Sequence, residues 1–367
     1  MAASVLVPVL NEGDAIREVV AAMRDQRLPG GSLEFILAHG PSADDTRPQL
    51  EDLAREDERI RIVENPAGDT ASGLNLCLRE ARGTYVVRMD AHTIYPREYI
   101  FDGVRRLERG DVAWVAGPQV PEGRGPVSRA VTAALQSWIG RGGSRKWSTA
   151  DVTEENNSNE EYDLDTGVFC GVWRRADLIS VGGFDEEWPI NQDSELAARF
   201  LRRDHRIVCL PAMAARYYPR DSLDGLWRQY RRYGLYRAKT ALRHPTSLRR
   251  SAILPPVVAI DLAMALVAPG KLRRLARVGL IPYAGLVAYE AMQLARRGKP
   301  VEAGLLPVVL PTIHLAHGVG FIEGASRWGI PWRALLRVSG TYRPENDEQP
   351  YRGPVNASGL NGSAPKT

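Results

Sequence analysis

The sequence that decides the fold is GLNLCLREARGTYVVRMDAH at Gly73–His92. Its apolar spacing predicts a helix over Ser72–Arg82, and the run Tyr85–Met89 predicts a short buried strand. That strand leads directly to Asp90, two residues before His92. An acidic side chain at the end of a buried strand can hold a divalent cation, which would bridge the two phosphates of a nucleoside diphosphate. A simpler interpretation is that Asp90 caps the following turn and that His92 lies at the surface.

The same alternation of short apolar runs and helical segments continues on both sides of this stretch. Strands are predicted at Ser4–Leu10, Glu34–Ala38, Arg61–Glu64 and Val112–Ala116, and a helix is predicted at Ala15–Arg27. Strands that alternate with helices are typical of an α/β fold. We therefore expect an α/β domain with a mainly parallel central sheet.

Polar residues stand after several of these strands, as expected for a ligand site of a parallel sheet. Glu12, His39 and Asp90 each stand at or just after the carboxyl end of a predicted strand, where such sheets bind their ligands. The loops Pro8–Glu12 (PVLNE) and Gly40–Thr46 (GPSADDT) could together cup a nucleoside. Taken separately, each is an ordinary turn at a strand end.

Two later segments also carry side chains that could do chemistry. In Asn191–Glu195 (NQDSE), Asp193 could be the N-cap of the next helix, or a general base that takes a proton from a sugar hydroxyl. In Gln229–Tyr233 (QYRRY), the arginines could form a solvated basic face. Alternatively, Arg232 could stabilise the phosphates of a donor.

The composition is that of a globular protein in a reducing compartment. The chain of 367 residues is 44% hydrophobic and 25% charged. Its three cysteines are widely spaced and form no CxxC pair, so we expect neither disulfides nor a structural zinc site. The N-terminus shows no leader peptide pattern. These features indicate a cytoplasmic location.

Positive charge and apolar segments gather in the C-terminal third. Residues 216–300 carry 17 Lys or Arg against four acidic residues, which favours an anionic membrane surface or an anionic substrate. No nucleic-acid recognition motif accompanies this charge, so nucleic acid is not an expected partner. Apolar segments at 252–268, 278–295 and 304–322 are near or below the roughly 20 residues that span a bilayer. They could span it, re-enter it or lie in the interface.

These changes of composition divide the chain into four expected parts. Residues 1–225 form the α/β domain, which a long polar loop interrupts at 141–165. Residues 226–250 form a basic amphipathic helix region, and residues 251–325 form membrane-associated hydrophobic helices. Residues 344–367, rich in Asn, Gly, Ser and Pro, form a disordered tail.

Taken in order along the chain, these segments resemble the family 2 glycosyltransferases, which have a GT-A fold. SVLVPVLNE is similar to the opening strand of the family, GPSADDT to its second-strand loop, and Gly73–His92 to the segment that leads to the metal-binding DxD. Asp165–Glu186 resembles the acceptor segment, Asn191–Arg203 resembles the catalytic-base segment, and Gln229–Tyr233 is similar to QxxRW. The resemblance covers about residues 3–240. The DAH form and the hydrophobic C-terminal third resemble the succinoglycan-biosynthesis glucosyltransferase type.

The resemblance implies a metal-dependent, inverting transfer of a sugar from a nucleotide-diphosphate sugar, with a UDP-sugar favoured. It implies a lipid-linked glycan acceptor at the cytoplasmic face of the cell membrane, in exopolysaccharide or cell-envelope glycan synthesis. The catalytic base would be Asp193, and the metal, Mn²⁺ or Mg²⁺, would be held by Asp90 and His92. The implied donor-binding residues are Pro8, Asn11, Glu12, His39, Asp44, Asp90 and Arg232. The implied acceptor-binding residues are Asp165, Gly171, Gln229 and Tyr233.

The chain departs from the family pattern at two positions. His39 stands where the family usually has an Asp that contacts uracil, so the base of the nucleotide stays open. His92 replaces the second Asp of DxD, and histidine accepts Mn²⁺ more readily than Mg²⁺. A catalytically inactive membrane scaffold with the same fold is the alternative that His92 supports. A processive synthase would need more spanning helices, and a nucleotidyltransferase would need a basic phosphate loop after the first strand.

Overall fold

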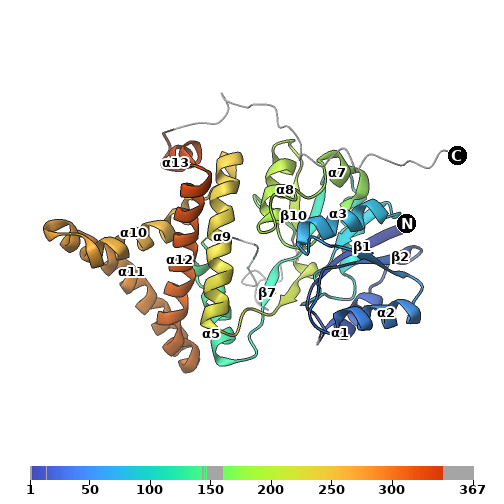
Figure 1. The fold of residues 1–367 in the computed structure, drawn as a ribbon, viewed down its shortest axis with the longest axis horizontal. Helices are drawn as coiled ribbons and strands as arrows, with labels where there is room; N and C mark the ends of the chain where they lie inside the picture. Colours follow the sequence, from blue (N-terminus) through green and yellow to red (C-terminus); the bar gives the residue numbers. More distant parts are fainter. Residues whose placement is uncertain (1, 14, 143, 145, 147–159, 342–367) are drawn as a thin grey trace. The chain divides into compact units, whose positions relative to one another are not determined.

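The computed structural model describes residues 2–13, 15–142, 144, 146 and 160–341, and it forms two compact units (Figure 1). Within the described residues, the first unit spans residues 2–120 and 160–217, and the second spans 121–146 and 218–341. The second unit thus includes a segment from the middle of the chain, which the composition does not reveal. The predicted tail at 344–367 and most of the polar loop lie outside the described residues.

The first unit is built on an eight-stranded mixed sheet. Its strands, in the order β3-β2-β1-β4-β9-β6-β10-β8, are β3 (Ile60–Glu64), β2 (Ser32–His39), β1 (Ala2–Val9), β4 (Tyr85–Arg88), β9 (Gly171–Arg174), β6 (Trp114–Ala116), β10 (Ile207–Cys209) and β8 (Tyr162–Asp163). A small second sheet has the order β5-β11-β7, from β5 (Thr93–Ile94), β11 (Ala215–Tyr217) and β7 (Gln119–Pro121).

Six helices of the first unit flank or cap this sheet. They are α1 (Ile16–Arg24), α2 (Thr46–Glu56), α3 (Thr70–Glu80), α4 (Tyr99–Leu107), α7 (Arg175–Ser180) and α8 (Gln192–Leu201). Figure 1 shows α1 and α2 on one face of the β1–β2 part of the sheet and α3 on the other. The strand–helix alternation predicted from sequence is confirmed, with ends that differ by one to a few residues.

The parallel register of the inner strands brings the predicted site residues to one edge. Three consecutive residues of β1, Val5–Val7, are fully buried, as expected for a strand covered on both faces. β1 runs parallel to β2, with Val9 opposite His39, and parallel to β4, with Leu6 opposite Arg88. The carboxyl ends of the three strands therefore meet at the same edge. β9 pairs antiparallel with both β4 and β6, which the sequence pattern does not predict.

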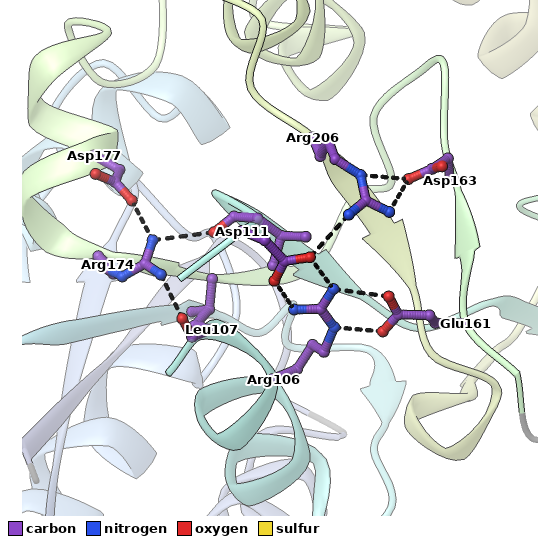
Figure 2. Close-up of polar contacts among 9 residues, drawn as sticks. Arg106, Leu107, Asp111, Glu161, Asp163, Arg174, Asp177 and Arg206 are labelled. Carbon is purple, nitrogen blue, oxygen red and sulfur yellow. Dashed lines mark hydrogen bonds and ion pairs between the residues drawn. The ribbon is translucent and has the colours of Figure 1, made fainter. Parts of the chain in front are cut away.

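A network of ion pairs fixes the far side of the sheet, where the chain returns to the described residues at Glu160 (Figure 2). Arg106, at the end of α4, is buried and bonds both Asp111 and Glu161. Arg206 joins Asp111 to Asp163 at 2.8 and 2.9 Å. Hydrogen bonding to Arg106 lowers the pKa of Asp111 to about 2. The network thereby ties β8 to the α4–β6 turn and to β10.

The second unit is helical. Its helices are α5 (Pro126–Gln136), α6 (Trp138–Arg141), α9 (Leu223–Arg243), α10 (Leu254–Val267), α11 (Gly270–Arg296), α12 (Pro300–Trp328) and α13 (Trp332–Ser339). By length and composition, the segment Arg250–Val267 and the helix α12 could each cross a membrane. α12 is also a core helix, because Leu306 and Leu310 are fully buried against α5 and α9 residues of the same cluster.

α9 and α12 pack with their backbones in close approach (Figure 1). A Cβ atom added to Gly234 of α9 would lie 1.9 Å from the carbonyl oxygen of His317, and one added to Gly320 would lie 1.9 Å from that of Arg231. Arg231 also bonds Glu323 at 2.8 Å across the pair. Small residues allow such contact, as in closely packed membrane helices. The glycines therefore fix the position of α9 on α12.

We predict that Gly320→Ala lowers the free energy of unfolding of the second unit by about 1–3 kcal/mol, because the added methyl forces the two helices apart. The matched control is Gly304→Ala in the same helix, where nothing lies within 4 Å of an added Cβ. That control should be neutral or slightly stabilising, by helix propensity. Thermal unfolding of the two detergent-solubilised variants makes the comparison, and equal midpoints would contradict the packing account.

Candidate functional site

The loops after β1 and β2 are hydrogen-bonded to each other. Asn11, which has a left-handed backbone (φ 55°), donates its backbone N–H to Ser42 Oγ at 2.9 Å and accepts from the backbone N–H of Ala43 at 2.8 Å. The backbone N–H of Gly13 donates to Asp44 at 3.1 Å. Asn11 and Asp44, which are predicted to bind the donor substrate, thus hold the two loops in one conformation.

Asp44 also holds Thr46, the first residue of α2. Its carboxylate accepts from the hydroxyl of Thr46 at 2.5 Å and from the Thr46 backbone N–H at 3.1 Å. The Thr46 hydroxyl, with the help of backbone N–H groups, lowers the pKa of Asp44. Thr46 Oγ1 in turn accepts from the backbone N–H of Glu12 at 2.9 Å. The two loops therefore form one preorganised wall at the strand edge, beside the half-buried Pro8.

His39 ends β2 and is 8% exposed. Its Nδ1 lies 3.9 Å from a carboxylate oxygen of Glu64. Its Nε2 is buried and has no hydrogen-bond partner among the residues that the structure describes. Buried polar atoms without a partner are uncommon in folded proteins, and many of them face a bound ligand, ion or water.

Asp90 comes directly after β4 and Met89 and is held by a buried arginine. Arg88 donates from Nε to one carboxylate oxygen of Asp90 at 2.8 Å and from Nη2 to the other at 3.1 Å. The backbone N–H of Asp90 donates to the hydroxyl of Tyr95 at 2.8 Å. Arg88 and Asp90 are 3% and 7% exposed. A bidentate, buried pair of this kind fixes both side chains in one orientation.

Arg88 keeps its charge despite its burial. Burial by itself would lower the pKa of the guanidinium, but the charge and hydrogen bonds of Asp90 outweigh it and leave that pKa raised, with a contribution from Asp193. The sequence patterns do not single out Arg88, although a charged residue in the apolar run YVVRM is itself a signal, because buried charges need partners.

His92 follows Asp90 by two residues and lies at the exposed side of this edge of the sheet. Its Nδ1 lies 3.3 Å from Oε1 of Glu12, so the ends of β1 and β4 are joined by an imidazole–carboxylate contact. Its side chain is 52% exposed, and that of Glu12 is 21% exposed. Tyr217 lies edge-on to the imidazole, with ring centroids 6.5 Å apart.

The residues present fit a divalent cation that is shared with a substrate. Each Asp90 oxygen accepts one hydrogen bond from Arg88 and retains a second lone pair. Among the described residues, no group of three or more His, Cys, Asp or Glu could hold a metal ion. A cation at Asp90 would thus need further ligands from phosphate and water, which is the way Mg²⁺ and related ions are commonly held at phosphate sites.

Asp193 lies in the first turn of α8, one residue after the helix begins. The N-cap is Asn191, so the interpretation of Asp193 as the N-cap is wrong. A Cβ added to Gly167 would lie 2.1 Å from the backbone oxygen of Asp193. The segment after the exposed Asp165 therefore packs directly on the start of α8.

A fully buried ion pair anchors α8 below Asp193. Arg199 bonds both carboxylate oxygens of Glu195, with distances from 2.6 to 2.9 Å, and donates to the backbone oxygen of Val181 at 2.7 Å. Both side chains have no exposed surface. Removing one partner of such a pair leaves an uncompensated buried charge, so the pair fixes the helix that carries Asp193.

Gly171 lies in β9, opposite Arg88. A Cβ added there would lie 2.1 Å from Nε1 of the Trp114 indole, so the packing of the sheet requires a glycine at this position. Its part in acceptor binding stays a prediction. Gln229, Arg232 and Tyr233 lie on α9 in the second unit, where Gln229 donates to the Tyr233 hydroxyl at 3.0 Å. Their parts in donor and acceptor binding also stay predictions.

The mixed sheet with a parallel core and flanking helices is that of the GT-A fold. The solved mannosyltransferase PcManGT of Pyrobaculum calidifontis, in complex with GDP-Man and Mn²⁺, shares this fold with a TM-score of 0.50 and 18% sequence identity. The alignment covers 89% of this chain and 87% of that one. The predicted fold class is therefore confirmed.

The profile of the family "Glycosyl transferase family 2" matches residues 4–181. The succinoglycan biosynthesis protein ExoA of Rhizobium meliloti (strain 1021) is 29% identical over 335 residues, which cover 90% of this chain and 94% of that protein. The uncharacterized glycosyltransferase EpsJ of Bacillus subtilis (strain 168) is 32% identical over 87 residues, 24% of this chain and 25% of that one. Residues 4–181 of this chain thus form a family 2 glycosyltransferase domain.

Proposed function

We propose that this glycosyltransferase carries out a metal-dependent, inverting transfer from a nucleotide-diphosphate sugar to a lipid-linked glycan. The observation that carries the proposal is the placement of Asp90. Its carboxylate is held at the carboxyl edge of the sheet, beside the wall formed by the β1 and β2 loops. Diphosphate, sugar and acceptor would then lie between Asp90, which faces the diphosphate, and Asp193, which faces the acceptor.

Donor binding begins at the β1–β2 wall. The buried Nε2 of His39 would meet a polar atom of the base, and the backbone of the two fixed loops would line the ribose. PcManGT was solved with GDP-Man. In the family pattern, by contrast, an Asp at the position of His39 contacts uracil. We propose a UDP-sugar, because an imidazole can meet the polar edge of uracil as a donor or an acceptor.

Asp90 and His92 would hold the metal, and the bound ion would supply positive charge to the departing diphosphate. The second predicted ligand is an imidazole that lies against Glu12, and imidazole with carboxylate favours Mn²⁺ over Mg²⁺. Arg88 keeps the Asp90 carboxylate in one orientation. Arg232 is proposed to add a second positive charge near the phosphates.

Asp193 is proposed as the general base. Its carboxylate would take the proton of the acceptor hydroxyl as that oxygen bonds to the anomeric carbon and the bond from that carbon to the phosphate oxygen breaks. A single displacement of this kind inverts the anomeric centre. The proton ends on Asp193, and the electron pair of the broken bond leaves with the nucleoside diphosphate.

The second unit is proposed to bring the enzyme to a membrane-borne acceptor. Large apolar side chains are exposed along α10 and α11, namely Leu266, Val267, Leu272, Leu275, Val278 and Ile281. Lys271, Arg273, Arg274 and Arg277 accompany them in the first two turns of α11, which suits a surface of anionic lipids. The name of ExoA assigns that relative to succinoglycan biosynthesis, and we propose a polysaccharide precursor as the acceptor here.

We predict that Asp90→Ala abolishes transfer and metal-dependent nucleotide binding. A screen of UDP- and GDP-sugars with Mn²⁺, Mg²⁺ or EDTA, read by release of nucleoside diphosphate and by calorimetry, identifies the donor for the wild type. Activity of the wild type should depend on Mn²⁺ and disappear with EDTA. A wild type that neither binds nor cleaves any donor would favour the inactive scaffold, and an active Asp90→Ala variant would refute the metal role.

We predict that Asp193→Asn and Glu195→Gln separate chemistry from stability within one helix. Asp193→Asn should bind donor normally and lose transfer by a factor on the order of 10²–10⁴, the usual contribution of a general base. Glu195→Gln should instead lower the free energy of unfolding by about 3–5 kcal/mol, because Arg199 loses its buried partner. Single-turnover assays and urea unfolding make the comparison. Normal transfer by Asp193→Asn would exclude it as the base.

We predict that the α10–α11 surface binds anionic vesicles. The wild type should float with vesicles of phosphatidylcholine and phosphatidylglycerol, and less so with phosphatidylcholine alone. Val267→Glu with Leu275→Glu should reduce flotation, whereas the control Leu223→Glu, at an exposed apolar position at the start of α9, should not. Equal flotation of all three proteins would exclude this surface as the membrane contact.

A further inference from the structure

One guanidinium nitrogen of Arg88 donates a hydrogen bond to none of the described residues. Two of its three guanidinium nitrogens bond Asp90. The third, Nη1, is buried and has no hydrogen-bond partner among the residues that the structure describes. A guanidinium has five N–H donors in a fixed plane, and a buried one is expected to use them. The unpaired nitrogen therefore marks a place for an acceptor atom from outside the described residues, such as an atom of a bound substrate.

The surroundings of Arg88 indicate which part of the nucleotide sugar supplies this hydrogen-bond acceptor. The guanidinium bonds Asp90, and Arg88 pairs with Gly171 of β9. In the proposed function, on which this inference rests, Asp90 faces the diphosphate, and Gly171 is a predicted acceptor-binding residue. In an in-line displacement, the transferred sugar lies between the leaving phosphate and the acceptor hydroxyl. A residue that contacts both Asp90 and Gly171 is therefore beside the sugar.

We propose that Arg88 is a donor-binding residue whose Nη1 donates a hydrogen bond to a hydroxyl oxygen of the transferred sugar. Because Nε and Nη2 are held by Asp90, the direction of the third nitrogen is fixed before the donor binds. A fixed, charged donor in a buried site recognises one hydroxyl, and it discriminates against sugars that lack it. Arg88 thereby couples choice of sugar to the orientation of the carboxylate that holds the metal.

Arg88→Lys tests this role, because lysine keeps the charge beside Asp90 but has no planar fork. The measured quantity is the ratio of the dissociation constant of UDP-glucose to that of UDP, obtained by calorimetry with Mn²⁺. The ratio should rise by about tenfold, the effect of a lost hydrogen bond to a charged group. If the screen selects a guanosine donor, GDP-mannose and GDP replace the uridine pair. An unchanged ratio in a folded variant overturns the proposal.

Arg106→Lys is the matched control. Arg106 is likewise a buried arginine of the first unit, but all three of its guanidinium nitrogens bond Asp111 or Glu161 (Figure 2). The control substitution should lower the melting temperature and leave the ratio of the two dissociation constants as in the wild type. A ratio that rises equally in both variants would show that loss of a buried arginine perturbs the site indirectly, and the proposal would fall.

Modified substrates keep the test independent of folding. With the wild-type enzyme, one monodeoxy form of UDP-glucose should bind about tenfold more weakly than UDP-glucose, and Arg88→Lys should no longer distinguish the two. If all monodeoxy forms bind the wild type equally well, Arg88 has no sugar partner. Failure of the wild type to bind either nucleoside diphosphate, UDP or GDP, would instead refute the proposed function, so the two failures are distinguishable.

Discussion

The structure of the candidate site depends on one buried ion pair, between Arg88 and Asp90. Both charges lie almost out of contact with water, and burial of an ion costs several kcal/mol unless geometry and hydrogen bonds offset it. Here two direct hydrogen bonds, with the anchoring of the Asp90 backbone by Tyr95, supply that compensation. A buried pair has few alternative arrangements, so Arg88 and Asp90 contribute more to the orientation of the site than to the stability of the fold.

Ion pairs and hydrogen bonds also fix the elements that surround the site. α8 is fixed from below by Glu195 and Arg199, which are wholly buried, and the returning strand β8 is fixed through Arg106. The loops after β1 and β2 are fixed by neutral and charged hydrogen bonds between Asn11, Asp44 and backbone groups. Each element that carries a candidate side chain is thus held by polar contacts with defined directions, as preorganised sites require.

Local periodicity in the sequence is enough to predict the parallel half of the fold. The four parallel strands, the helices between them and Asp90 at a strand end all come from runs of apolar residues and their spacing. Periodicity does not predict the antiparallel insertion of β9 or the assignment of α5 to the second unit, because both depend on contacts between segments far apart in the chain. The partner of Asp90 escapes prediction for another reason. Residues two apart in a strand face the same side, but a reading of apolar runs treats Arg88 only as an interruption and does not identify the carboxylate that offsets its charge.

The two histidines that break the family pattern acquire a common explanation from their neighbours. His39 lies 3.9 Å from a carboxylate oxygen of Glu64, and His92 lies 3.3 Å from one of Glu12. Where the family motif has an acidic side chain, this chain thus places an imidazole with a glutamate behind it. A carboxylate that contacts an imidazole ring orients it. The acidic groups of the strand edge are therefore kept one side chain further out, although the family motif read along the sequence has lost them.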